Sequence, residues 1–184
     1  MVNWSTTWGM LFNPTKCKVM RLTRKDTDPP SYKMLGVDLE ETKDDKYLGT
    51  YLQSDLRWNK QVNHAKNKAT RTLNFLKRNF HHTSSSVKEK LFDTLVRPHL
   101  DYASAAWDPY TNKNIDHLEK VQNAAARFIT NTYGKDTSVT ALKDQLGWPS
   151  LQERRRNRRL NCLYKILNDH MDIDKTKYIQ QKIE

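Results

Sequence analysis

Residues 58–80 carry the side chains whose type and spacing point most directly to chemistry. Basic residues recur through this stretch and acidic residues are absent from it; the basic members are Lys60, Lys66, Lys68, Arg71, Lys77 and Arg78. Ammonium and guanidinium groups in such a run neutralise phosphates without reading a base sequence. A helix stabilised by ordinary surface ion pairs would mix both signs of charge. The stretch therefore predicts contact with a polyanion, and a solvated basic face is the alternative.

The same residues predict one long amphipathic helix. Apolar side chains recur at steps of three and four, which places them on one stripe at 100° per residue; they are Trp58, Val62, Ala65, Ala69, Leu73, Leu76 and Phe80. A second set lies roughly opposite and is here called the basic face: Lys60, His64, Lys68, Arg71 and Arg78. The helix should bury the first face and present the second to its ligand.

A second basic cluster lies in a helix predicted over residues 150–171. Ser150 followed by Glu153 forms the pattern of a capping box at its start. We expect one face to be buried and the other to carry the cations; the apolar members are Leu160, Leu163, Leu167 and Met171, and the basic members are Arg154, Arg155, Arg158 and Lys165. Three interpretations stay open: a second nucleic-acid surface, a nuclear localisation patch, or a solvated helix face.

Other reactive side chains give weaker signals. Cys17 and Cys162 are isolated, and the six histidines show no ligand spacing on one predicted face, so we predict no metal site. The pair Asp44–Asp45 is interpreted as part of a solvated loop. Aromatic residues between 102 and 110 could stack on bases, but their helical spacing favours a packed core; they are Tyr102, Trp107 and Tyr110.

Composition narrows the class of partner. The chain has 184 residues, of which 36% are hydrophobic, and a net charge of +11. This length fits one domain or two small units, and the charge favours nucleic acid. No apolar run approaches the roughly 20 residues that a membrane helix needs, and the N-terminus lacks the pattern of a signal peptide. We therefore expect an intracellular protein, nuclear or cytoplasmic, without a membrane partner.

The elements that would position these groups change in type along the chain. Short strands are predicted over 16–23, 32–39 and 46–52, with an acidic loop over 40–46. Helices follow from residue 58, and further helical patterns cover 87–105, 114–130 and 137–146, with a break or kink at Pro98. The predicted fold class is α+β, mostly α: a small antiparallel β-hairpin region followed by a bundle of about five helices.

Read in order, several motifs resemble one family. They are FNPTKCKVM (12–20), KYLGTYL (46–52), the basic helix, LVRPHLDYASAAWDP (95–109), IDHLEKVQNAAARFI (115–129) and LGWPSLQERRRNRRL (146–160). Over residues 4–168 the chain resembles the C-terminal part of reverse transcriptases from LINE-type (non-LTR, jockey-like) retrotransposons. The resemblance implies a C-terminal palm remnant with a primer-grip hairpin over 1–57, a helical thumb and post-thumb helices over 58–171, and a tail over 172–184.

The resemblance also implies roles for individual residues. Lys16 matches the lysine of a late palm motif, where it would act as a general acid toward pyrophosphate; the alternative is a lysine that flanks a strand. The tripeptide Tyr47, Leu48 and Gly49 matches the primer grip, where a glycine lets a nucleic-acid backbone approach closely; the alternative is a core strand. The helix over 58–80 would be the first thumb helix, which contacts template–primer duplex.

One feature of the family is absent from the sequence. The family's polymerases hold two Mg²⁺ ions on separated aspartates, one of them in an aromatic-x-Asp-Asp turn, and no such turn occurs here. We therefore expect a truncated chain that is not an enzyme on its own, needs no cofactor, and binds RNA or RNA–DNA hybrid beside the missing palm and fingers of the same polymerase. Two alternatives stay open: a non-enzymatic protein-interaction module built on residues 84–171, and a non-functional product of a decayed element.

Overall fold

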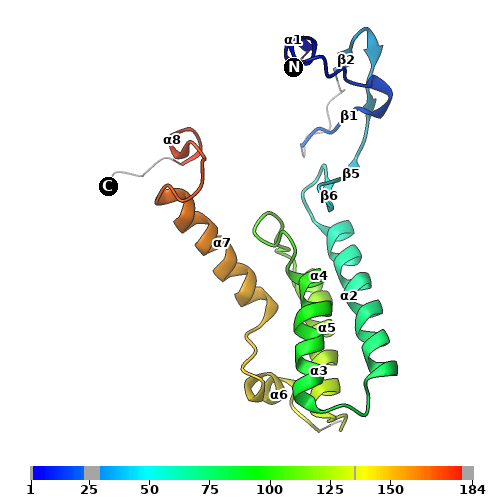
Figure 1. Ribbon diagram of the computed structural model, residues 1–184, viewed down its shortest axis with the longest axis vertical. Helices are drawn as coiled ribbons and strands as arrows, with labels where there is room; N and C mark the ends of the chain where they lie inside the picture. The colour runs from blue at the N-terminus through cyan, green and yellow to red at the C-terminus, as the bar shows by residue number, and fades with distance from the viewer. Residues whose placement is uncertain (1, 23–29, 135, 180–184) are drawn as a thin grey trace. The chain divides into compact units, whose positions relative to one another are not determined.

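The computed structural model describes residues 2–22, 30–134 and 136–179 (Figure 1). The chain divides into two compact units, Met1–Gln61 and Val62–Glu184. Short strands and turns make up the first unit, and helices make up the second. This confirms the predicted fold class, α+β and mostly α. Residues 180–184 of the predicted tail lie outside the described part.

The first unit contains a short helix, a 3-10 turn and three pairs of strands. The helix is α1 (Val2–Thr7) and the turn is η1 (Pro14–Lys16). The pairs are β1 (Lys18–Val19) with β4 (Glu40–Glu41), β2 (Lys33–Met34) with β3 (Val37–Asp38), and β5 (Asp44–Tyr47) with β6 (Thr50–Gln53). The last two pairs are antiparallel, as expected for hairpins, whereas β1 and β4 run parallel.

Several predictions in this unit were wrong in detail, and residues 32–39 form the β2–β3 hairpin instead of one strand. Residues 46–52 form a hairpin, as the resemblance to a primer grip implied, and not the single strand predicted from alternation; Leu48 and Gly49 both have positive φ, 46° and 83°, as in a tight two-residue turn. The pair Asp44–Asp45 lies in strand β5 and not in a solvated loop. Asp44 pairs with Gln53 and Asp45 with Leu52 across the hairpin, so the acidic residues extend the ladder that the turn sets in register.

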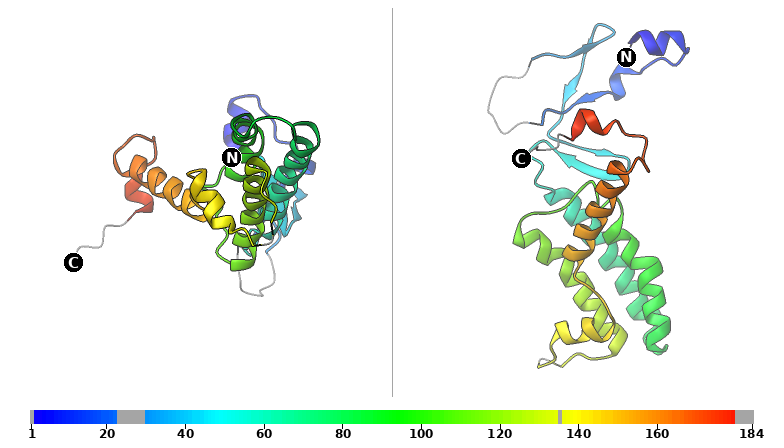
Figure 2. Two further views of the ribbon diagram at one scale, coloured as in Figure 1. Left: turned by 90° about the horizontal axis from the view of Figure 1, so that it is seen from below. Right: turned by 90° about the vertical axis from the view of Figure 1, so that its left-hand side faces the viewer.

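The second unit is built from a long helix and the helices that follow it. Their bounds are α2 (Asn59–Asn79, which begins in the first unit), α3 (Ser85–Leu91), α4 (Arg97–Asp101), α5 (Asn112–Thr130), α6 (Val139–Gln145), α7 (Leu151–Leu167) and α8 (Lys175–Tyr178). Figures 1 and 2 show α2 alongside the α3–α4 segment and α5. None of the helices in the described part is both long and apolar enough to cross a membrane.

The core of this unit confirms the predicted stripe on α2. Its buried members are Val62, Ala65, Ala69, Leu73 and Leu76, each at most 2% exposed. Other helices contribute Phe92, Leu100, Leu118 and Ile129 to the set of fully buried side chains. Because the stripe is shielded from water, the opposite face of α2 is left at the surface, as the charge pattern predicted.

The predicted helix over 87–105 is interrupted near Pro98. A π-helical segment, η2 (Phe92–Val96), links α3 to α4, and Pro98 lies in the first turn of α4. Proline is tolerated there because the first helical N–H groups have no intrahelical acceptor. The helix ends at Asp101, not at 105, and Ala103 then adopts a positive φ of 51°.

The orientation predicted for the helix over 150–171 was wrong. Leu160, Leu163 and Leu167 are 51%, 42% and 41% exposed, whereas Arg155 is 2% exposed. The arginines at the start of α7 face the segment 100–108, where aspartates and backbone carbonyls accept their hydrogen bonds. A buried guanidinium is stable when such acceptors surround it. The ion pairs and hydrogen bonds of the arginines therefore determine which face of α7 is covered.

Candidate nucleic-acid interface

The basic face of α2 is exposed in the second unit. Lys68, Arg71 and Arg78 are all exposed, and His64 is half-buried. Within the described residues none of these three cations has an ion-pair partner, and Arg71 only donates to the carbonyl of Asn67 one turn earlier, at 3.3 Å. An unpaired cation row on a rigid helix can neutralise successive phosphates along a nucleic-acid backbone.

Lys60 occupies a different environment at the start of α2. It belongs to the first unit, where its ammonium forms an ion pair with Asp44 and lies 5.1 Å from the centre of the Tyr51 ring. The hydrogen bond to Asp44 raises the pKa of Lys60. Its backbone N–H donates to Gln53 Oε1 at 2.8 Å, so this residue joins the helix to the β5–β6 hairpin. Lys60 is thus tied within its own unit, unlike the other lysine on the basic face.

The flank of α2 extends the positive charge toward α5. Burial and the charges of Lys66, Lys120 and Lys113 lower the pKa of His117 on α5. Burial also lowers the pKa of Lys77 near the end of α2. Lysines from both helices therefore act on one histidine, and the positive potential is not confined to α2.

The predicted primer-grip residues form the tip of the β5–β6 hairpin. Tyr47 and Leu48 are 66% and 75% exposed, and Gly49 completes the turn. A leucine with positive φ is unusual, since the left-handed region is unfavourable for most L-residues by about 1–2 kcal/mol. An apolar side chain held outward on a strained turn favours contact with a ligand over the core-strand alternative. That this hairpin tip acts as a primer grip remains a prediction.

Lys16 and the pair Asp44–Asp45 lie in separate elements of the first unit, η1 and β5. Lys16 is exposed in the turn η1, which Asn13 caps by accepting hydrogen bonds from the N–H and hydroxyl of Thr15. Neighbouring residues on a strand point to opposite faces, and Asp44 is engaged by Lys60. Asp44 and Asp45 therefore do not suit a site for two Mg²⁺ ions. No group of three or more possible ligands occurs in the part that the structure describes.

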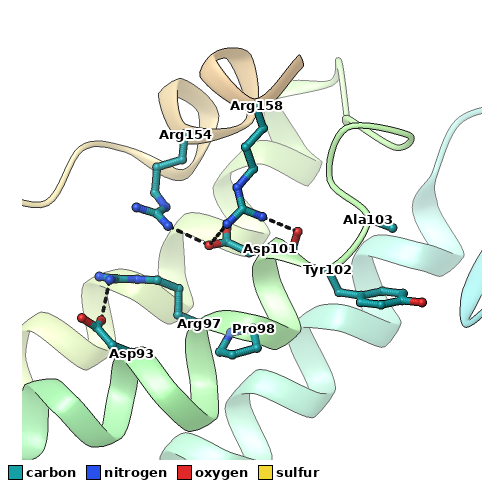
Figure 3. A pocket seen from close by; sticks show the side chains of 8 residues that line it. All are labelled: Asp93, Arg97, Pro98, Asp101, Tyr102, Ala103, Arg154 and Arg158. Atoms are coloured by element: carbon teal, nitrogen blue, oxygen red, sulfur yellow. Dashed lines mark hydrogen bonds and ion pairs between the residues drawn. The ribbon is translucent and has the colours of Figure 1, made fainter. Parts of the chain in front are cut away.

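The arginines of α7 lie at a cavity between α4 and α7 (Figure 3). Asp101 Oδ2 accepts from Arg154 Nη2 at 2.8 Å and from Arg158 Nη2 at 2.9 Å. Arg158 also donates to the backbone carbonyl of Asp101 at 2.6 Å. Arg97 and Asp93 also line the cavity and form an ion pair with each other. Two of the predicted binding residues are thus brought together here.

Unlike Arg154 and Arg158, Arg155 does not line this cavity and is buried. It donates to the carbonyl of Leu100 at 2.9 Å and to that of Leu151 at 3.3 Å, and its guanidinium lies 5.0 Å from the centre of the Trp107 ring. Burial lowers the pKa of Arg155, and the nearby carboxylate of Asp108 opposes that effect. Because Arg155 is only 2% exposed, its role in this structure is to hold α7 onto the loop after α4.

The aromatic cluster divides between core and surface. Trp107 is fully buried, as predicted for a packed core, but Tyr102 and Tyr110 are 57% and 59% exposed. Sequence reasoning missed the acidic partners Asp101 and Asp108. The arginines at 154, 155, 158 and 159 share one helix face, but no local pattern indicated that these two aspartates, some fifty residues earlier, would pair with them.

Comparison with known proteins finds a relative among the polymerases of transposons. The chain is 23% identical, over 176 aligned residues, to a probable RNA-directed DNA polymerase from transposon X-element of Drosophila melanogaster. The similarity supports a reverse transcriptase-like origin. It covers 87% of this chain and 19% of the relative, so this chain corresponds to about a fifth of that protein's length. Neither a family model nor a solved structure matches the chain.

Proposed function

We propose that this chain is the C-terminal part, covering the end of the palm, the primer grip and the thumb, of a LINE-type retrotransposon reverse transcriptase. In this proposal it binds RNA–DNA template–primer duplex through the basic face of α2. The exposed row of Lys68, Arg71 and Arg78 without carboxylate partners carries the proposal. A rigid helix that presents only cations is suited to the backbone of a duplex, which proteins recognise by shape and phosphate position.

The proposal assigns binding and not chemistry to these residues. The adjacent carboxylates Asp44 and Asp45 do not converge, so the two-metal mechanism would need acidic residues from elsewhere in the polymerase. The relative is named as a polymerase and is several times longer than the matched region. Residues outside that region would supply the palm and fingers, and Mg²⁺ would bind there.

Neutralising the basic face tests the proposal. In a variant with Lys68→Gln, Arg71→Gln and Arg78→Gln we expect affinity for a labelled RNA–DNA hybrid to fall at least about tenfold, since the loss of even one charge-assisted contact of about 1.5–3 kcal/mol accounts for that factor. A matched control removes the same charge from exposed positions outside α2, with Lys90→Gln, Arg156→Gln and Lys165→Gln. Equal losses in both variants would mean that net charge, not this helix face, determines binding.

One observation favours a second candidate, a protein-interaction module. The outward side of α7 carries Leu160, Leu163 and Tyr164, which are 42–59% exposed and lie one turn or less apart. Exposed apolar stripes of this kind are typical of helix-in-groove recognition. Reversing the charges of Lys60, Lys68 and Arg71 separates the two candidates: a module that binds protein through α7 would keep its partner and any nucleic-acid binding, whereas duplex binding through α2 would be lost.

A further inference from the structure

Helix α7 presents an apolar side to solvent along its later turns. Four apolar side chains recur there at steps of three and four and form one stripe, here called the α7 stripe; they are Leu160, Leu163, Tyr164 and Leu167. These side chains are 41–59% exposed. The buried residues of the helix, Leu151 and Arg155, lie across it from the stripe. Figures 1 and 2 show the later turns of α7 extending away from α5, which leaves the stripe accessible to a partner.

The order of the residues makes the α7 stripe complementary to itself. In a two-fold dimer each copy contributes the same surface, and two helices related in this way across their length run antiparallel. If the axis passes between Leu163 and Tyr164, these two residues lie beside each other across the interface. Leu160 of each copy then lies beside Leu167 of the other. Every member of the stripe gains an apolar partner in this arrangement, and both copies bury it from water.

A cavity at the end of the stripe adds room for the second copy. Its volume is about 360 Å³, and it lies where α8 approaches the end of α7; the lining residues are Leu167, Lys175, Thr176 and Ile179. In the antiparallel arrangement Leu160 of the second copy reaches the edge of this cavity, because it lies beside Leu167. The stripe therefore offers a recess to the side chain at its other end.

The charges at the two ends of the stripe also favour an antiparallel pair. Residues 153–160 hold five arginines and one glutamate, whereas residues 168–174 hold three aspartates and no lysine or arginine. Four of these arginines pair with Asp101 or Asp108, but Arg156 has no ion-pair partner within the described residues. The exposed Asp172, in the segment that follows α7, likewise has none there. Antiparallel packing brings Arg156 of each copy beside residues 171–172 of the other, whereas parallel packing would place like charges together.

A second copy fits the surface better than other occupants. The three aspartates at one end would repel a nucleic-acid backbone or an anionic membrane surface. A different protein would need a helix with an apolar stripe, a basic end and an acidic end in the reverse order. The chain itself supplies that pattern.

We infer that two copies of this chain associate through antiparallel α7 helices, with their α7 stripes in contact and Arg156 of each copy paired with Asp172 of the other. The inference goes beyond the proposed function, because it concerns a protein partner and does not involve the basic face of α2. The interface is one helix wide, so it belongs to the class of small, weak interfaces. The dimer should accordingly dissociate at micromolar concentrations.

Sedimentation velocity of the full chain, freed of nucleic acid and kept under reducing conditions, measures the association. The average mass should rise from that of a monomer near about 1 μM toward that of a dimer near about 200 μM. Leu163→Asp places a carboxylate at the centre of the interface and should weaken association at least about tenfold. Leu95→Asp is the matched control, because Leu95 is 44% exposed, against 42% for Leu163, and lies outside α7. It should change the dissociation constant by less than about twofold.

A charge swap distinguishes a second copy from any other partner. Arg156→Glu should weaken the dimer about fivefold, because both ion pairs across the axis become repulsive. Asp172→Arg should have the same effect, and the double variant should return to within about twofold of the wild-type chain, since the reversed charges attract again. Both residues are exposed, so these variants remain informative if Leu163→Asp fails to fold.

Three results would overturn the inference. They are a chain that stays monomeric at about 200 μM, equal effects of Leu163→Asp and Leu95→Asp, and a double charge variant that associates no better than the single variants. The hybrid-binding assay for α2 is made below about 1 μM, where the chain is a monomer. Failure of the dimer therefore leaves the proposed function standing, and failure of hybrid binding leaves the dimer standing.

Discussion

Replacing Arg155 by alanine should destabilise the helical unit strongly, although the residue is one of three consecutive arginines. Its guanidinium donates to the carbonyls of Leu100 and Leu151, at 2.9 and 3.3 Å, from a position that is 2% exposed. Each hydrogen bond from a charged donor contributes about 1.5–3 kcal/mol. In the variant, Asp108 would still form its ion pair with Arg159, 2.9 Å away, so its carboxylate would not be left unpaired. We therefore expect Arg155→Ala to lower the unfolding free energy by about 3 kcal/mol.

The neighbouring residue provides the control. Arg156→Ala removes the same charge from an exposed position and should change stability by no more than about 0.5 kcal/mol. For a chain of this size 3 kcal/mol corresponds to a fall in Tm of about 6–12 °C. Urea denaturation followed by circular dichroism, with a thermal scan on the same samples, measures both variants. Equal midpoints for Arg155→Ala and Arg156→Ala would refute the packing of α7 described above.

Three other predictions concern local features of the fold. Leu48→Asn should stabilise the β5–β6 hairpin by about 1 kcal/mol, because asparagine tolerates positive φ; faster amide exchange in the hairpin would contradict this. Asn131→Gly keeps the left-handed backbone but removes the acceptor of the buried Lys88 ammonium, 2.6 Å away. It should lower stability by about 1–3 kcal/mol, and the same change in a Lys88→Met background should have almost no effect in a double-mutant cycle. Because the pKa values of His99 and His117 are lowered by burial in the folded state, the unfolded chain binds more protons, and stability should fall as the pH drops below about 6.5. Replacing both by glutamine should flatten that dependence, and an unchanged slope in calorimetric scans between pH 5 and 7 would contradict it.

Periodicity predicted the long helices because burial alone determines their orientation. The stripe from Val62 to Leu76 is uniformly apolar, and Gln61, the buried polar side chain at its start, accepts a hydrogen bond from the backbone of Tyr51. The helix over 114–130 was also predicted and is found as α5, although its buried face includes the polar side chains Asn114 and Gln122. In both helices local pattern and tertiary packing agree, which is the case in which sequence reasoning succeeds.

The helix α7 shows why other parts could not be predicted. Its leucines and its arginines occupy opposite faces, so burial of either face was consistent with the periodicity. The aspartates that decide the matter, Asp101 and Asp108, lie some fifty residues earlier in the sequence. Partners this far apart are visible only once the fold brings them together, and the cavity beside Tyr102 exists for the same reason.

The resemblance implied a hairpin at residues 47–49, but the residue pattern alone predicted a single strand there, for a local reason. Leucine at a position with positive φ gives no turn signal, whereas asparagine or aspartate before Gly49 would have predicted the turn. The parallel pairing of β1 with β4 also has no signature in strands of two residues.

The dependence of hybrid binding on salt tests the central claim most directly. The claim is that the basic face of α2 contacts the phosphates of a template–primer duplex. Affinity for a labelled RNA–DNA hybrid is measured between 50 and 200 mM salt, for the wild-type chain and for the variant with Lys68→Gln, Arg71→Gln and Arg78→Gln. The slope of log affinity against log salt should be steep for the wild type and smaller by about two to three in the variant, since each lost phosphate contact removes about 0.9. A flat wild-type slope, or the same slope in both proteins, would contradict the account.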